Sequence, residues 1–202
     1  WQGLYLALGA GLLLQLAGYL SFHVLPWTRN PAEVQAQAYD YIKWRSASAV
    51  ATQVSFCLMG FFMGRRDVRK PMIAGIVANL VNVVLDLWLI FGWSGLELAG
   101  RRWLAVPPMG VAGAAIATSI GNVVQMAMLI GWFVLPALHR RRYRTHRPRR
   151  PSPRRLGDIV RVGTPSAWEN FVDMASFAFF STLIGQAGAV SLAASQITVQ
   201  LL

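Results

Sequence analysis

The sequence predicts an all-α protein, a polytopic bundle of membrane-spanning helices. Apolar side chains make up 55% of the 202 residues and charged ones only 13%, which is too apolar for an ordinary soluble domain. Apolar runs of spanning length recur along the chain. The clearest, residues 72–92, would reach about 31 Å as a helix, close to the thickness of a bilayer's hydrocarbon core. Basic residues concentrate between the runs, as in cytoplasmic loops.

The first half of the chain is predicted to open with two spans. An apolar run over residues 3–25 forms the first and ends at a proline. An amphipathic helix follows, with Asn30 as its cap and Pro31 at its first position. We expect this helix to continue without a break into a second span at about 46–64.

Two further spans follow, joined by a long connector. The third is the run 72–92, and the fourth extends over about 109–135. The connector, 93–108, carries Trp93 and Trp103 and only two arginines, which is typical of the membrane interface on the side opposite the basic loops.

Small residues predict where helices approach each other. Gly60 and Gly64 form a small-xxx-small pair in the second span, and the fourth span opens with the run MGVAGAAIATSIG. Both patterns favour close contact between neighbouring helices.

A fifth span is predicted over about 159–183, and a sixth apolar segment begins at Ala189. The chain starts at Trp1 and ends at Leu202 inside apolar runs, so we expect it to be a piece of a longer protein. Three regions result: spans in 1–137, an Arg- and Pro-rich linker over 138–157, and a second group of spans from 158 to 202.

The net charge of +11 belongs mostly to one loop. Residues 139–161 contain ten arginines and a single aspartate. With the shorter basic loop at 65–70, this places residues 139–155 and 65–70 on the cytoplasmic side of the cell's inner membrane. We expect the larger loop to contact anionic lipid headgroups. Nucleic acid is not an expected partner, because no groove-reading or base-stacking motif accompanies the arginines.

The third span contains polar groups that need an explanation. Asn79, Asn82 and Asp86 are spaced i, i+3, i+7 and therefore share one helix face. A charge near the bilayer centre costs about 2.5–3.5 kcal/mol on insertion scales, so such an acid is expected to face protein or water, to be neutralised, or to bind a cation.

Polar residues also align in the fourth and fifth spans. Thr118, Asn122 and Gln125 lie on one face of the fourth, and Glu169 and Asp173 are one turn apart in the fifth. The simplest explanation for such groups is hydrogen bonding between helices, at about 0.6 kcal/mol each. Burying a carboxylate in the membrane costs more free energy than burying an amide that could make the same hydrogen bond. The acids therefore indicate a function beyond helix packing.

Two ion chemistries remain open for the acids. A carboxyl group buried in a low dielectric has a raised pKa and can carry a proton at neutral pH. When deprotonated, Asp86 with the oxygens of Asn79, Asn82 and Thr118 offers hard ligands suited to Na⁺. We expect no cofactor other than this coupling ion, H⁺ or Na⁺.

Enzymatic functions are not supported. The sequence has no GxSxG, HExxH or P-loop pattern. Its one cysteine, Cys57, excludes an intrachain disulfide and a cysteine-based zinc site. We therefore expect neither catalytic residues nor a structural metal.

Several motifs resemble the multidrug and toxic compound extrusion (MATE) transporters. The run NLVNVVLDLWLIFG is followed after the connector by MGVAGAAIATSIG, and beyond the basic loop by VGTPSAWENFVDMASF and LIGQAGAVSLAASQI. They occur in order over most of residues 35–202. The resemblance implies a twelve-helix fold of two six-helix bundles, of which this chain would hold roughly helices three to eight, with 1–137 as helices three to six of the first bundle.

The resemblance also implies site residues. In some family members a first-bundle cation site uses an Asn and an Asp four residues apart and a Thr of the next helix. These match Asn82, Asp86 and Thr118. The family site also uses an Asp of the first helix, which the resemblance places outside this chain. Other branches carry an acid four or eight residues after the proline of the seventh helix. Here these positions are Glu169 and Asp173, after Pro165.

The function implied is a secondary active antiporter, monomeric at full length, that exports cationic or amphipathic compounds in exchange for H⁺ or Na⁺. One alternative is a lipid-linked oligosaccharide flippase of the same superfamily, which would need basic residues to hold a pyrophosphate. Another is a non-transporting membrane scaffold whose basic loop binds anionic lipid.

Overall fold

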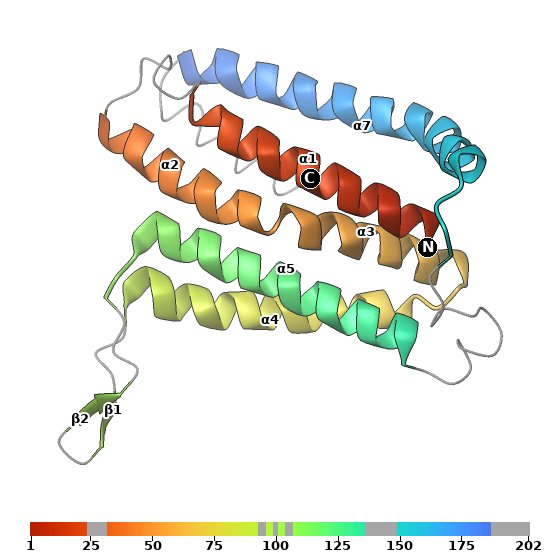
Figure 1. Ribbon diagram of the computed structural model, residues 1–202. Coiled ribbons are helices and arrows are strands. Elements are labelled where there is room, and N and C mark those ends of the chain that lie inside the picture. Colours follow the sequence, from red (N-terminus) through yellow and green to blue (C-terminus); the bar gives the residue numbers. More distant parts are fainter. Residues whose placement is uncertain (24–31, 93–95, 99–100, 104–106, 136–148, 187–202) are drawn as a thin grey trace. The chain divides into compact units, whose positions relative to one another are not determined.

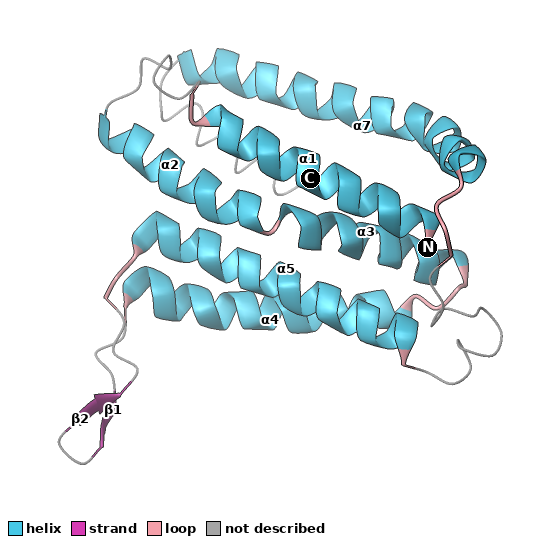
Figure 2. Ribbon diagram, viewed as in Figure 1, coloured by secondary structure: helices cyan, strands magenta, loops and turns pink. Residues whose placement is uncertain are grey.

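The computed structural model describes residues 1–23, 32–92, 96–98, 101–103, 107–135 and 149–186. Within them, nearly all regular structure is helical, which confirms the all-α prediction (Figures 1 and 2). The chain divides into two units, Trp1–Pro151 and Ser152–Leu202.

Helix α1, Gln2–Ser21, corresponds to the predicted first span. The prediction for the next element is wrong in one respect, because a continuous helix was expected. Instead, α2, Ala32–Ala47, and α3, Ala49–Gly64, are separated at Ser48. Their axes differ by 46°. The expected cap, Asn30, and Pro31 lie outside the described residues.

The break at Ser48 has a local cause. Hydroxyl groups of Ser46 and Ser48 donate to the backbone carbonyls of Lys43 and Arg45, at 3.1 and 3.0 Å, and Thr52 donates to the carbonyl of Ser48. Such hydrogen bonds back to the preceding turn compete with the helical backbone pattern and bend helices. The backbone N–H of Ser48 accordingly bonds the carbonyl three residues earlier, at 3.3 Å.

Helices α4, Arg69–Phe91, and α5, Gly110–Val134, form the third and fourth predicted spans. Helix α4 is unbroken, as the run 72–92 predicts, and ends at Gly92, whose φ of 75° suits glycine. The connector between them contains an unpredicted antiparallel hairpin, β1, Leu96–Leu98, and β2, Arg101–Trp103, with Leu96 opposite Trp103.

Close helix contacts form at glycines other than the predicted pair. A Cβ on Gly60 or Gly64 would meet nothing within 4 Å in the described structure, so the close contact that this pair permits is not made there. The small-residue run of α5 does mediate close packing. A Cβ on Gly113 would lie 2.7 Å from the carbonyl oxygen of Leu89, and one on Gly121 would lie 3.1 Å from that of Ala78.

The apolar core of the first unit lies toward the end of the helices nearest the 65–70 loop. Leu58 and Phe62 of α3 pack there with Leu129 and Phe133 of α5 and Ala74 of α4. At the loop, Lys70 pairs with Asp67 at 2.8 Å. Asn82, Asp86 and Thr118 lie farther along α4 and α5, whereas Gln125 contacts Met59, which packs against this core.

The second unit contributes one long helix, α7, Pro153–Gln186, with Pro165 inside it. It covers the predicted fifth span, 159–183, but it is not among the described helices that are apolar enough to cross a membrane. Arg161, Glu169 and Asp173 explain this, because each charge lowers the hydropathy of any window that contains it. The sixth segment, from Ala189, lies outside the described residues.

Three described helices, α1, α4 and α5, have the length and apolar composition of membrane spans, and the bent pair α2–α3 adds a fourth if it counts as one. Large apolar side chains on α1 and α4, such as Leu13, Leu80 and Leu87, are exposed, as expected of surfaces that face lipid or further helices. The chain is therefore a multi-pass membrane protein.

Candidate ion and substrate site

The predicted residues of the third and fourth spans meet between α4 and α5, which lie side by side (Figure 1). Gly121 lets the helices approach closely, since its position would place a Cβ only 3.4 Å from Cβ of Asn82. At this separation the short side chains of Asn82 and Thr118 reach each other directly. The small-residue packing of α5 therefore positions the candidate site.

Asn82 lies between Asp86 and Thr118 and can pair with both. In one orientation of its amide, the nitrogen donates to Oδ2 of Asp86 at 3.2 Å and the oxygen accepts from the backbone N–H of Thr118 at 3.0 Å. In the other, the nitrogen donates to Oγ1 of Thr118 at 3.3 Å. The first orientation satisfies both ends of the amide and one carboxylate oxygen, so it is the better assignment.

The second oxygen of Asp86 is the unusual feature of the site. Oδ1 is buried and has no hydrogen-bond partner among the side chains and backbone that the structure describes. A buried polar atom without a partner costs about 1–3 kcal/mol, and more when it carries charge. This oxygen is therefore well suited to hold a proton or to bind a cation.

Asp86 is less central than the sequence suggested. Six residues separate it from Leu80, the midpoint of α4, which is about 9 Å along the helix axis. It lies toward the end of α4 that leads to the β1–β2 hairpin. Asn79, by contrast, is at the middle of the helix.

A polar cavity of about 130 Å³ adjoins Asn82 on the side away from Asp86. It has room for several water molecules. Asp86 does not line this cavity, but Asn82, which can donate to Asp86, does. The side chains lining the cavity are mostly amides and hydroxyls with small residues between them: Gly75, Ala78, Asn79, Asn82, Thr118, Gly121, Asn122 and Gln125.

The structure thus brings together Asn82, Asp86 and Thr118, with Asn79 at the edge of the same cavity. Asn79 itself is exposed and is not hydrogen-bonded to the other three. Asn122 and Gln125, which share the face of Thr118, also line the cavity. No group of three or more His, Cys, Asp or Glu side chains that could hold a metal occurs in the described ranges.

Glu169 and Asp173 lie in the second unit, both exposed on one face of α7. Carboxylates four residues apart on a helix repel each other when both are charged. Nearby, Asn170 donates to the carbonyl of Ser166 at 2.7 Å. These two acids are a candidate site of the second unit.

Sequence reasoning missed two residues near this site. Ser48, at the α2–α3 break, accepts a hydrogen bond from Asn122 at 3.5 Å and one from Arg45 at 2.9 Å. A serine in an apolar run carries no pattern that predicts such a contact. The signal for Arg45 was present, as a guanidinium directly before the predicted span at about 46–64.

Comparison with known proteins supports the resemblance seen in the motifs. Residues 1–88 match the model of the MatE family. The chain is 28% identical over 200 residues to the probable multidrug resistance protein NorM of Thermotoga maritima, covering 98% of this chain and 40% of that protein. It is 34% identical over 134 residues to the DNA damage-inducible protein F of Escherichia coli, covering 64% of this chain and 25% of that protein.

A third relative, the multidrug resistance protein MdtK of Yersinia pestis, is 26% identical over 98% of this chain and 41% of its own length. No solved structure matches. The chain spans about two fifths of the length of NorM and MdtK and a quarter of that of protein F. The family match over residues 1–88 and these relatives together make the chain similar to the MatE family, that of the MATE transporters.

Proposed function

We propose that this chain is part of a secondary active exporter of cationic or amphipathic compounds, and that Asp86 carries the coupling ion. The unpaired, buried Oδ1 of Asp86 is the observation that carries the proposal. Relatives named as multidrug resistance proteins support the export of drugs or toxins. The protein would be a transporter and not an enzyme.

The coupling ion would be H⁺ or Na⁺, with no other cofactor. A proton on Oδ1 would neutralise Asp86 while Asn82 continues to donate to Oδ2. A sodium ion would instead need oxygen ligands, and the Asn82 amide would have to turn its oxygen toward the ion. The two cases differ in the orientation of one amide, so Asn82 would respond to the ion that binds.

In an antiport cycle, ion and substrate would bind alternately as two halves of the full-length protein rock between inward-open and outward-open states. Glu169 and Asp173 would supply a second ion site in the other half. We place the protein in the inner membrane, as a monomer, with the loops 65–70 and 139–155 in the cytoplasm beside anionic headgroups and without a nucleic-acid partner.

The proposal can be tested with the full-length protein in inside-out vesicles. Asp86→Asn should abolish dye accumulation driven by an H⁺ or Na⁺ gradient, because it removes the ionisable group while keeping the size of the side chain. Asp86→Glu, which keeps the carboxylate, should retain part of the activity. Unchanged accumulation with Asp86→Asn would contradict the role given to Asp86. No gradient-driven accumulation by the unaltered protein would leave the scaffold alternative as the better account.

The flippase alternative depends on basic residues in the cavities. The α4–α5 cavity is lined by amides and hydroxyls without lysine or arginine, which favours an exporter of cations. One arginine, Arg45, does line another cavity. A single guanidinium does not match the charge of a pyrophosphate, so export remains the function that the site supports best.

A further inference from the structure

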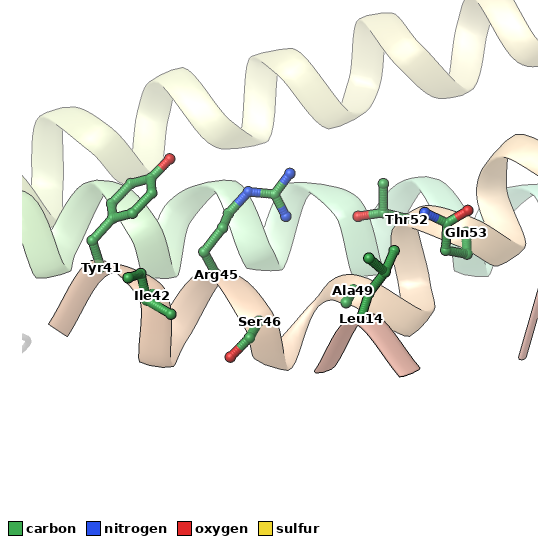
Figure 3. Close-up of a pocket in the computed structure, with 8 residues that line it drawn as sticks. All are labelled: Leu14, Tyr41, Ile42, Arg45, Ser46, Ala49, Thr52 and Gln53. Atoms are coloured by element: carbon green, nitrogen blue, oxygen red, sulfur yellow. The ribbon is translucent and has the colours of Figure 1, made fainter. Parts of the chain in front are cut away.

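A second and larger cavity lies where α2 meets α3, beside α1. Its volume is about 340 Å³. Leu14 and Ile42 give it apolar walls, and Arg45, Thr52 and Gln53 give it polar ones. Figure 3 shows the guanidinium of Arg45 extending from α2 on the same side as Thr52 of α3, whereas Ser46 points the opposite way.

Arg45 brings a positive charge to this cavity without a compensating carboxylate. Among the described side chains, the Arg45 guanidinium donates one hydrogen bond, from Nη1 to Oγ of Ser48 at 2.9 Å. The ion pair between Lys70 and Asp67 lies elsewhere, at the 65–70 loop. A guanidinium has five N–H donors. A partly buried cation with most donors unused favours an anionic partner.

Ser48 holds the guanidinium in place. Ser48 is only 2% exposed. Its hydroxyl donates to the carbonyl of Arg45 at 3.0 Å and accepts from the Arg45 side chain. It also accepts from Asn122 at 3.5 Å, a residue that lines the α4–α5 cavity. The helix break at Ser48 therefore orients Arg45 and links the two cavities through one hydroxyl.

We propose that the Arg45 cavity binds the anionic group, a carboxylate or phosphate, of an amphipathic ligand. Arg45 would pair with the anion, Thr52 and Gln53 would add hydrogen bonds, and Leu14 and Ile42 would contact the apolar body of the ligand. This deepens the proposed function, on which it rests, because it extends the substrate class to amphipathic molecules with a negative group. Such a group could belong to the transported compound or to a membrane lipid.

Arg45 also has a structural role that the test must separate from binding. It lies in the last turn of α2, where a cation interacts favourably with the helix dipole. The interaction of Arg45 with the helix dipole does not depend on whether a ligand has a free carboxyl group. The discriminating measurement is therefore a comparison of two ligands that differ only in that group.

Rhodamine B, which has a free carboxylate, and its ethyl ester form such a pair. Their affinities would be measured by fluorescence anisotropy on the full-length protein in nanodiscs of neutral lipid. The wild type should bind the acid more tightly than the ester. Arg45→Gln should weaken binding of the acid roughly tenfold, the order expected for one charge-assisted interaction, and change the ester less than about twofold.

Two further variants sharpen the result. Arg45→Lys keeps the charge and should retain most of the preference for the acid, and Ser48→Ala should reduce it less than Arg45→Gln does. The proposal is overturned if the wild type does not distinguish acid from ester, or if Arg45→Gln affects both equally. Asp86→Asn should keep the preference even though it stops efflux, which separates this proposal from the ion-coupling one.

Nanodiscs that contain phosphatidylglycerol distinguish the two sources of the anion. If a lipid headgroup occupies the cavity, the preference of the wild type for rhodamine B should shrink in these discs, and Arg45→Gln should remove that effect of the lipid. If the transported compound supplies the anion, the preference should be the same in both lipids. Either result supports an anion site at Arg45 and identifies its ligand.

Discussion

Asp86 has two oxygens in unequal surroundings, and this asymmetry defines its chemistry. Oδ2 can accept from the Asn82 amide at 3.2 Å, whereas Oδ1 is buried without a partner in the described structure. The hydrogen bond fixes the carboxyl group, and the free oxygen is left to bind an ion. A carboxylate with both oxygens paired would bind an ion less readily.

Asn82 is therefore expected to matter for ion coupling although it carries no charge. Asn82→Ala removes the donor to Oδ2, leaves both carboxylate oxygens unpaired, and should cost about 1–3 kcal/mol. The ion concentration that gives half-maximal dye transport by the full-length protein should shift several-fold.

Asn79→Ala is the matched control. Asn79 is an asparagine on the same helix, three residues away, but it is exposed and does not pair with Asp86 or Thr118. Its replacement should leave the ion dependence of transport nearly unchanged. Equal effects of the two alanine variants would contradict the role given to Asn82.

The spacing of polar residues predicted much of this site, and the rest needed three-dimensional contacts. The i, i+3, i+7 pattern placed Asn79, Asn82 and Asp86 on one face, but it could not show that only Asn82 reaches both Asp86 and Thr118. The role of Ser48 depends on hydrogen bonds to another helix, which leave no periodic signal in the sequence.

At the scale of the helices, close packing of α4 on α5 sets the distance between the site residues. The carbonyl of Leu89 would be 2.7 Å from a Cβ at Gly113, so any side chain there must push the two backbones apart. The contact also includes the backbone N–H of Met109, which donates to the carbonyl of Leu89 at 2.9 Å.

Gly113→Leu should therefore destabilise the full-length protein by about 1–3 kcal/mol, as overpacking does. Its melting temperature in detergent should fall, and ion-driven transport should weaken because Thr118 moves away from Asn82. The comparison variant is Gly60→Leu, at a position that meets nothing within 4 Å in the described structure. A melting temperature lowered as much by Gly60→Leu would contradict this packing account.

Most helices could be predicted from apolar run length, while their breaks and contacts could not. Helix α4 follows from the run 72–92, because no proline interrupts it and its polar residues, Asn79, Asn82 and Asp86, share one helix face. The break at Ser48 escaped prediction because serine is common in helices, and it bends one only when its hydroxyl bonds back to the chain. The Gly60–Gly64 pair makes no close contact in the described structure, because a small-residue pattern permits contact without requiring it.

At the scale of the whole molecule, the first unit leaves extensive apolar surface uncovered, including Leu12, Leu80 and Phe91. We expect further helices and lipid to cover it in the full-length protein. The 202-residue chain alone should therefore not transport, since it would lack part of the cavity and part of the ion sites. Ion-driven dye uptake by liposomes that contain only this chain would refute this expectation.

The positions of the basic loops are a second expectation at this scale. With Cys57 replaced by Ser, single cysteines introduced at Arg66 and Arg144 in the full-length protein should both react with a membrane-impermeant thiol reagent only from the cytoplasmic side. A cysteine at Gly95, in the connector, should react only from the opposite side. Labelling of both basic loops from the outside would contradict the proposed topology and support the inverted one.

The central claim is that Asp86 exchanges its ion when substrate binds. It can be tested directly by adding a cationic dye to the purified full-length protein and measuring the H⁺ or Na⁺ released, with a pH indicator or a sodium electrode. We predict that the wild type releases about one ion per bound dye. Asp86→Asn should bind the dye without releasing an ion. Undiminished release by Asp86→Asn, with loss in Asp173→Asn instead, would contradict the claim and assign the coupling to α7.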